Sequence, residues 1–176
     1  MKRKFLIGIS FLYIVSLATS VYATEIDMVT ENKELKPGEI VTVKIGIKDI
    51  SVEEGINVIQ GRIRYDNDIF EKVENQDITS MNNWSMSYND ENTDSEGKFV
   101  ILKLSSSVKE NQDVLEVNFK VKESAKYAET SIELQELCTV EGDNIIKIGN
   151  SKVDVKVNGK SNIFTRFFNW IKNIFV

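Results

Sequence analysis

Apolar residues recur at every second position through much of the chain between residues 26 and 159, a spacing typical of β-strands with one buried face. Turn-forming residues separate these runs, and no stretch between residues 24 and 160 has a convincing helical period. Short alternating strands separated by turns predict a single all-β domain, an Ig-like or jelly-roll sandwich of about nine strands. The clearest inward rows are Val41, Val43, Ile45 and Ile47; Leu115, Val117, Phe119 and Val121; and Val153, Val155 and Val157.

The run from Phe99 to Leu104 departs from this alternation, because it is apolar on both parities. A strand with apolar side chains on both sides is normally covered on both sides. We therefore expect this run to form a strand in the interior of the sandwich, with neither face open to solvent.

The stretch from Gly55 to Glu71 joins a strand to a sharply defined turn. Asp66, Asn67 and Asp68 end the strand, because Asp and Asn side chains hydrogen-bond the local backbone and favour turns. The strand has one apolar face for the core and one polar face for water or a partner. The apolar positions are Ile59, Gly61, Ile63 and Tyr65, and the polar positions are Gln60, Arg62, Arg64 and Asp66.

A strand that enters Tyr65-Asp66, turns tightly and continues into Ile69-Phe70 resembles the third-strand region of cohesin domains, the scaffold modules that bind dockerins. Two further segments are similar to the same family. In Leu35–Ile45, Pro-Gly precedes a strand of alternating valines, and Leu115–Lys122 has the family's Phe-Lys-Val-Lys pattern. The resemblance covers roughly Ile26–Gly159.

The resemblance implies a non-catalytic module that binds a dockerin-like protein on an open sheet face, which includes the strand before Tyr65. Carried over to this chain, the partner-binding positions are Val58, Gln60, Arg62 and Arg64. Type I cohesins tend to carry small polar or acidic residues where Val58 and Gln60 stand, which implies a partner other than a standard dockerin. For Arg62 and Arg64, the alternative is an ordinary solvated face.

Carbohydrate binding by the same sandwich is the alternative function. Trp84, Met86 and Tyr88 share one parity of a predicted strand, where aromatic rings could stack on sugars. The simpler interpretation is that they form the core face of that strand, since Trp and Tyr bury large areas. The carbohydrate hypothesis, with Trp84 and Tyr88 as its site, requires these side chains to be exposed.

Composition narrows the classes of function. The 176 residues include 22 basic and 27 acidic side chains and no histidine. The acidic balance disfavours nucleic acid as a partner, because that binding depends on clustered cations. Without histidine, Ser-His-Asp and Cys-His nucleophiles and the most common metal ligand are excluded. No pair of carboxylates stands out as a glycosidase centre and no glycine-rich phosphate loop is present, so we expect no enzyme activity and no cofactor.

The chain has one cysteine, Cys138, so no intrachain disulfide can form. Cys138 shares the parity of Ile132, Leu134 and Val140, which predicts a small side chain buried in the core. A nucleophilic thiol and an intermolecular disulfide are the alternatives.

The acidic loop from Asn89 to Gly97 has part of the pattern of a calcium-binding loop. Asp90, Asn92 and Asp94 fall at the first, third and fifth positions of an EF-hand loop. The pattern then fails, because the sixth position, normally Gly, is Ser95, and the twelfth position lacks the required Glu. The sequence therefore predicts a hairpin loop and no metal site.

Residues 1–23 have the layout of a secretory signal peptide. Three basic residues precede an apolar stretch from Phe5 to Leu17, and small residues stand at the recognised positions before the cleavage site. We expect cleavage between Ala23 and Thr24 and secretion of the remaining chain. An uncleaved membrane anchor is the alternative.

The domain predicted for residues 24–160 ends at an abrupt change in composition. Residues 161–176 carry large apolar side chains at helical spacing, within an arc of about 160°, and polar side chains on the opposite arc. This pattern predicts a short amphipathic helix with a net charge of +2. Its length, roughly 20 Å, is too short to span a bilayer.

Three interpretations of this helix stay open: packing on the sandwich, contact with a partner helix or a second copy, and lying in a membrane interface. Aromatic bulk on one face and cations on the other suit the interface. We therefore expect a reversible tether to the outer face of the membrane. The residues expected at the interface are Phe164, Arg166, Phe167, Phe168, Trp170, Ile171, Lys172 and Phe175.

Overall fold

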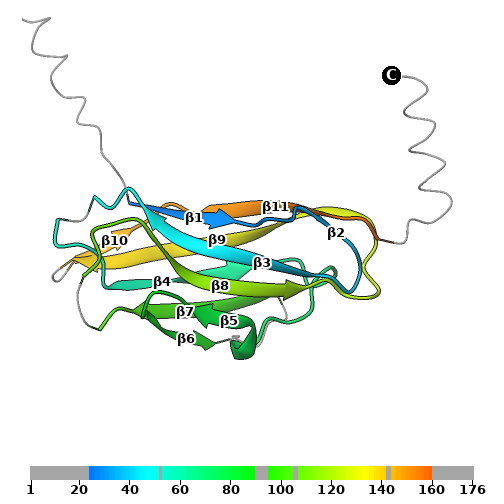
Figure 1. Cartoon of the computed structure of the whole chain (residues 1–176), viewed down its shortest axis with the longest axis horizontal. Helices are drawn as coiled ribbons and strands as arrows, with labels where there is room; N and C mark the ends of the chain where they lie inside the picture. The colour runs from blue at the N-terminus through cyan, green and yellow to red at the C-terminus, as the bar shows by residue number, and fades with distance from the viewer. Residues whose placement is uncertain (1–23, 52, 90–94, 105–106, 142–143, 160–176) are drawn as a thin grey trace, which may run out of the picture.

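Two β-sheets pack face to face around one apolar core in the computed structural model (Figure 1). The structure describes residues 24–51, 53–89, 95–104, 107–141 and 144–159, and these contain one 3-10 turn, η2 (Asn75–Asp77), and no α-helix. The strands are β1 (Glu25–Val29), β2 (Glu34–Leu35), β3 (Ile40–Lys48), β4 (Val58–Arg64), β5 (Ile78–Ser80), β6 (Ser85–Asn89), β7 (Glu96–Leu102), β8 (Gln112–Lys120), β9 (Ala128–Glu141), β10 (Asn144–Lys147) and β11 (Ser151–Val157).

The order of the strands places β4 inside the larger sheet. The smaller sheet runs β1-β3-β8-β5, and the larger runs β2-β11-β9-β4-β7-β6, with β10 also paired to β9. The 14 residues of β9 pair with β4 on one side and with β11 and β10 on the other. The predicted all-β sandwich is confirmed, with eleven strands among the described residues in place of about nine. The strands β2, β5 and β10 have two to four residues, too few to show an alternation in the sequence.

The predicted alternation is confirmed along all three apolar rows, because every side chain in them is buried. At the centre of the core, the rings of Tyr65, Phe70 and Phe119 meet edge to face, with centroids 5.6 to 6.5 Å apart. The backbone N–H of Val73 donates a hydrogen bond to the Tyr65 hydroxyl at 2.9 Å, so this polar atom is satisfied inside the core.

The turn predicted after β4 is present and leads the chain back into the core. The carboxylate of Asp66 accepts a hydrogen bond from the N–H of Asp68 at 2.9 Å, and its carbonyl accepts one from the N–H of Phe70 at 2.9 Å. Ile69 and Phe70 are buried directly after the turn. The turn therefore ends β4 and anchors its end beside the aromatic cluster.

The prediction that the run from Phe99 to Leu104 is covered on both sides is wrong. Phe99 and Ile101 are buried, but Leu102 is 39% and Leu104 84% exposed. Strand β7 lies between β4 and β6 in a sheet that packs on the other sheet with its inner side only. The outward parity of β7 therefore meets solvent, although its sequence is apolar.

The alternation predicted through Cys138 is also wrong, because β9 contains a β-bulge. The register between β4 and β9 shifts by one extra residue of β9, next to Glu136, whose φ is 53°. Leu134 lies before the bulge and faces the core. After the bulge Leu137 faces the core and Cys138 faces outward. Cys138 is buried, as predicted, but it lies outside the apolar core cluster.

Three predicted features lie outside the described residues: the signal peptide 1–23, the middle of the acidic loop, residues 90–94, and the amphipathic segment 161–176. These features stay predictions. No helix among the described residues is long and apolar enough to cross a membrane.

The packing of β4 on β9 depends on Gly61. A Cβ at this position would lie 2.6 Å from Cδ2 of Leu137 and 3.1 Å from Cζ of Phe99. We predict that Gly61→Val lowers the free energy of unfolding by about 1–3 kcal/mol, because overpacking displaces both neighbours. Urea denaturation measures this change. The control is Gly149→Val, where an added Cβ meets no atom within 4 Å; equal stability of the two variants would contradict the prediction.

Candidate functional site

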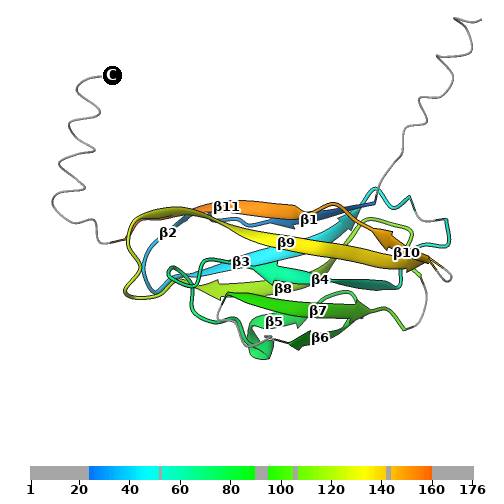
Figure 2. The ribbon, with the colours of Figure 1, turned by 180° about the vertical axis from the view of Figure 1, so that it is seen from behind.

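The outward side chains of β4 lie on the outer face of the larger sheet, the sheet nearer the viewer in Figure 2. Val58 and Arg62 are half-buried, and Gln60 and Arg64 are exposed. β4 is flanked by β9 and β7, so the four positions stand within the sheet and away from its edges. The sequence-predicted binding residues are therefore brought together on one face, which we call the β4 face.

Both arginines of the β4 face pair with carboxylates of the same chain. Nη1 of Arg62 donates to Oε2 of Glu96 at 2.6 Å, and its Nη2 lies 3.4 Å from Oε2 of Glu136. Nε of Arg64 lies 3.7 Å from the other oxygen of Glu96. The bulge in β9 exposes Glu136 opposite Arg62. The arrangement is a charge-balanced network that spans β7, β4 and β9.

Hydrogen bonds on the β4 face lower the pKa of two carboxyl groups, Glu96 of the network and Glu133 of β9. The hydrogen bond from Arg62 is the main cause that lowers the pKa of Glu96, and burial opposes it. Hydrogen bonds from Ser131 and Gln135 lower the pKa of Glu133. Both groups are therefore ionised at neutral pH, and the arginine charges are balanced from within the chain.

Gln60 faces the buried thiol of Cys138. The Gln60 side-chain amide donates to the sulfur of Cys138 at 2.9 Å, across the β4–β9 pair. Cys138 thus lies under the β4 face without opening onto it, since it is 7% exposed. This thiol is enclosed, which disfavours the nucleophile and the intermolecular disulfide that the sequence left open.

Exposed aliphatic residues adjoin the predicted positions, and the sequence analysis missed them. Leu102 stands opposite Val58 in the β4–β7 register, and Ile145 stands opposite Val140 in the β9–β10 register. Leu102, Val140 and Ile145 are 39%, 38% and 70% exposed. Leu102 was assigned to a doubly covered strand and Val140 to the core. Their exposure depends on the uncovered outer side of the larger sheet and, for Val140, on the bulge in β9. Neither feature is visible in the local sequence.

The aromatic residues proposed for sugar binding are in the core. Trp84 is 3% and Tyr88 7% exposed. The indole N–H of Trp84 donates to Oε1 of Gln112 at 3.3 Å, inside the molecule. The carbohydrate hypothesis required both rings at the surface, so it is wrong for these residues, and the core interpretation of this strand is confirmed.

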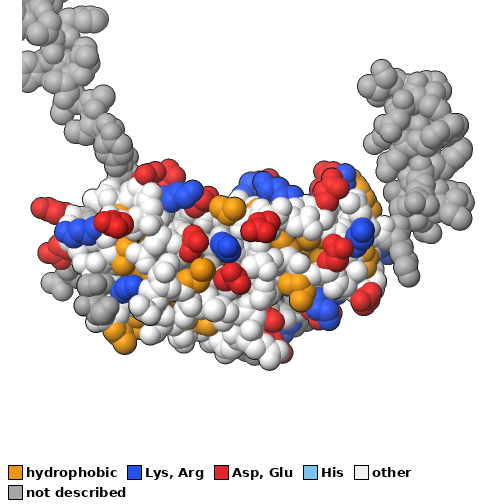
Figure 3. All heavy atoms as spheres, in the orientation of Figure 1, with side chains coloured by type: hydrophobic (Ala, Val, Ile, Leu, Met, Phe, Trp, Pro, Cys, Tyr) orange, Lys and Arg blue, Asp and Glu red, His pale blue; other side chains and the backbone are white. Residues whose placement is uncertain are grey.

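The outer face of the smaller sheet has a different character. Figure 3 shows this side of the molecule, where acidic and basic side chains are interspersed with isolated apolar ones. Lys48 pairs with Asp27, and Lys120 pairs with Glu71 at 2.9 Å. Single exposed apolar residues are ordinary on protein surfaces, so this face offers no distinct site.

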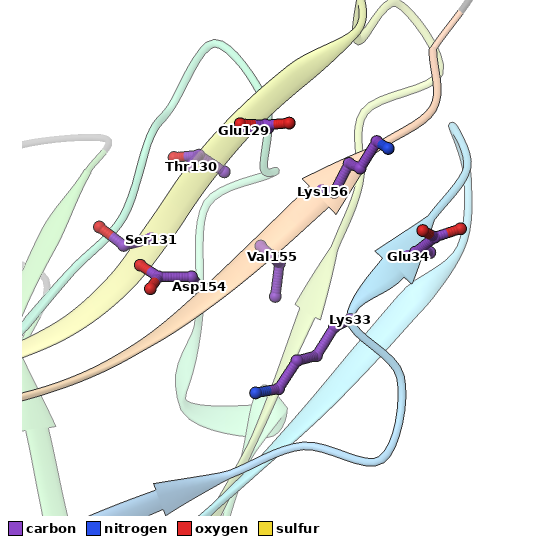
Figure 4. A pocket seen from close by; sticks show the side chains of 8 residues that line it. All are labelled: Lys33, Glu34, Glu129, Thr130, Ser131, Asp154, Val155 and Lys156. Atoms are coloured by element: carbon purple, nitrogen blue, oxygen red, sulfur yellow. The ribbon is translucent and has the colours of Figure 1, made fainter.

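A shallow hollow of about 550 Å³ lies near the edge of the larger sheet, between β2, β9 and β11 (Figure 4). Its charged side chains have both signs, and they are Lys33, Glu34, Glu129, Asp154 and Lys156. The hollow contains none of the residues predicted from the sequence. Its described lining also holds the hydroxyl groups of Thr130 and Ser131.

No group of three or more potential metal ligands occurs among the described residues. The acidic loop with Asp90, Asn92 and Asp94 lies outside them, and so do the interface residues predicted in 161–176. The described part of the chain therefore presents one surface that the sequence singled out, the β4 face.

A family model of the cohesin domain matches residues 26–160, which is most of the chain. The chain belongs to the cohesin domain family. The predicted resemblance is thereby confirmed, and with it the class of protein: cohesin domains are non-catalytic modules that bind dockerins. No curated protein sequence matches this cohesin.

Solved cohesins share its fold at low sequence identity. The cohesin module of a family 33 glycoside hydrolase from Clostridium perfringens has a TM-score of 0.67 at 19% identity, covering 79% of this chain and 99% of that one. A type I cohesin in complex with its dockerin, from Clostridium thermocellum, has a TM-score of 0.58 at 19% identity, covering 76% and 99%. A non-cellulosomal cohesin from Archaeoglobus fulgidus has a TM-score of 0.56 at 17% identity, covering 76% and 91%.

The lowered pKa of Glu96 predicts a specific pH dependence. A carboxyl group with a lowered pKa in the folded state contributes stability above its ordinary pKa, about 4.3, and this stability is lost as the pH falls through the lowered value. Glu96→Gln should cost about 0.5–1 kcal/mol at pH 7 and almost nothing near pH 2.

Thermal melts of the original chain and of the Glu96→Gln variant, recorded between pH 2 and pH 7, test the prediction. Arg62 and Arg64 contact Glu96 and are common to both proteins. Glu133 also titrates in both proteins, so the difference between their melting temperatures reports the contribution of Glu96 alone. If Glu96→Gln loses the same stability at pH 7 and near pH 2, the lowered pKa assigned to Glu96 is contradicted.

Proposed function

We propose that this cohesin is a binding module that attaches to a dockerin-like protein through the β4 face, with Val58, Gln60, Arg62 and Arg64 in contact with the partner. The observation that carries the proposal is the placement of all four side chains on one sheet face that no other described element covers. Membership of a family whose modules bind dockerins supports a dockerin-like partner.

The partner differs in chemistry from a standard dockerin of type I systems. The side chain of Val58 is aliphatic, and the side-chain amide of Gln60 is hydrogen-bonded to the sulfur of Cys138. The charges of Arg62 and Arg64 are balanced by Glu96 and Glu136. The partner therefore needs no acidic groups opposite them. Van der Waals contact then contributes more to binding than ion pairing does.

We also propose that the chain is exported and acts at the cell surface. The layout of residues 1–23 supports export with cleavage before Thr24, and the amphipathic pattern of residues 161–176 supports a tether in the outer face of the membrane. Residues 24–160 then form the binding domain between the two segments.

Capture from secreted proteins of the producing organism tests the β4 face. We expect the immobilised chain to retain a protein with a dockerin-like module, and Arg62→Glu plus Arg64→Glu to reduce its recovery by about tenfold or more. The substitution breaks the network and leaves carboxylates facing Glu96 and Glu136. Quantitative mass spectrometry of the eluate measures recovery.

The matched control is Lys44→Glu plus Lys48→Glu, which makes the same change in charge on β3 of the smaller sheet. This control should leave recovery unchanged. If the arginine variant folds, as judged by its melting curve, and retains the partner as well as the original chain does, the β4 face is not the binding surface.

Flotation with liposomes tests the tether. Residues 24–176 should float with vesicles that contain anionic lipid, and residues 24–160 should stay at the bottom of the gradient, because only the longer chain carries the apolar arc and its two cations. Phe167→Gln plus Trp170→Gln in the longer chain should abolish flotation. Equal flotation of the two lengths would defeat the proposal.

A further inference from the structure

Strand β6 forms a free edge of the larger sheet. It is the last strand in the order β2-β11-β9-β4-β7-β6, and among the described strands it pairs with β7 alone. It lies at the rim of the molecule in both Figure 1 and Figure 2. Alternate residues of an edge strand turn their backbone N–H and C=O groups away from the paired neighbour. Such a strand is a template for the addition of one more strand.

β6 lacks the features that usually protect a free edge. Native proteins blunt their edges with charged side chains, proline, bulges or very short strands. β6 has five residues, none of them charged or proline, and its register with β7 runs from Ser85 to Asn89 without a shift. The other described edge strands are shorter or charged: β2 has two residues, β5 has three, β10 has four and contains Lys147, and β1 contains Glu25 and Asp27.

The side chains of β6 form an apolar inner row and an uncharged polar outer row. Tyr88 is buried, and Met86 is half-buried against the core. Ser85, Ser87 and Asn89 are exposed on the outer side. A strand added at this edge would therefore extend the cover over Met86 and would meet no charged side chain of β6.

The sequence of β6 is complementary to itself in an antiparallel pair. When Ser87 lies opposite Ser87 of a second copy, all five residues pair, and residues of equal parity meet. The backbone groups that turn away from β7 in one copy therefore meet those that turn away in the other. On the inner side, Met86 stands opposite Tyr88 of the second copy, and a thioether packs favourably on an aromatic ring. On the outer side, Ser85 stands opposite Asn89, so no charges are brought together.

We propose that two copies of this cohesin associate through β6, antiparallel and about a two-fold axis at Ser87. The two-fold axis of an antiparallel strand pair stands perpendicular to the sheet. The two larger sheets thus join into one continuous sheet, with both outer faces on the same side. The contact uses the same surface on both copies and closes, which limits the assembly to a dimer. The dimer displays two β4 faces together, a consequence that rests on the function proposed above.

The contact between the two copies is small. Five residues of a strand span about 17 Å, and pairing over this length buries less than the roughly 1,200 Å² of the smallest stable interfaces. We therefore expect a weak, reversible dimer with a Kd on the order of 0.1 mM.

Sedimentation equilibrium of the full chain, over concentrations from about 10 μM to 1 mM, tests the inference. The original chain should shift from monomer to dimer across this range. Ser87→Lys and Ser87→Glu each place like charges directly opposite one another at the axis, so each should weaken the dimer by about tenfold or more. An equimolar mixture of the two variants should restore the dimer, because opposite charges then meet at the axis.

The matched control is Ser124→Lys, which makes the same change at an exposed residue between β8 and β9. This control should leave the Kd of the dimer unchanged. Hydrogen exchange of the original chain locates the contact, because the protection of residues 85–89 should rise with protein concentration.

Three outcomes would overturn the inference. The first is a chain that stays monomeric at about 1 mM. The second is a dimer that Ser87→Lys leaves intact, which would mean that the copies associate through another surface. The third is a mixture of Ser87→Lys and Ser87→Glu that stays monomeric. Partner capture with Arg62→Glu plus Arg64→Glu is measured separately, so the proposed function stands or fails independently of the dimer.

Discussion

The contact between β4 and β9 at Gly61 governs the rest of the larger sheet. Leu137 occupies the space that a side chain at position 61 would need, and it faces inward only because β9 contains one extra residue at Glu136. A bulge of this kind reverses the parity of every residue that follows it in the strand. The missing side chain on β4 and the extra residue on β9 are therefore complementary parts of one packing arrangement.

The same bulge determines what the β4 face presents. It exposes Glu136 where its carboxylate reaches Arg62, and it turns Cys138 and Val140 outward while Leu137 and Thr139 fill the core. Thr139 is fully buried and donates its hydroxyl to the carbonyl of Val58 at 2.6 Å, which holds the two strands together at this end. One backbone irregularity thus contributes both to the charge-balanced network and to the exposed aliphatic surface beside it.

The low identity to other cohesins agrees with this description of the fold. Solved cohesins between 15% and 19% identical superimpose on most of this chain. Distant sequences can share this fold because a sandwich requires only that each sheet bury one face, which an alternation of apolar and polar positions provides. The outward positions are not held by the core, so partner specificity is free to diverge there.

The amino-acid sequence alone determined the all-β class, the three buried rows, the turn at Asp66 and the outward placement of Val58, Gln60, Arg62 and Arg64. These features depend on local alternation and on turn chemistry, which neighbouring residues specify. Short motifs around Pro37-Gly38 and Tyr65-Asp66 likewise indicated membership of the cohesin family.

Only the tertiary structure decided which apolar residues are exposed. The exposure of Leu102 depends on β7 having an uncovered outer side, which follows from the order of strands in the sheet and not from the sequence of β7. The outward positions of Cys138 and Val140 depend on a bulge whose complement, Gly61, lies far away in the chain. Long-range pairing sets both, so a local pattern could not reveal that these side chains face outward.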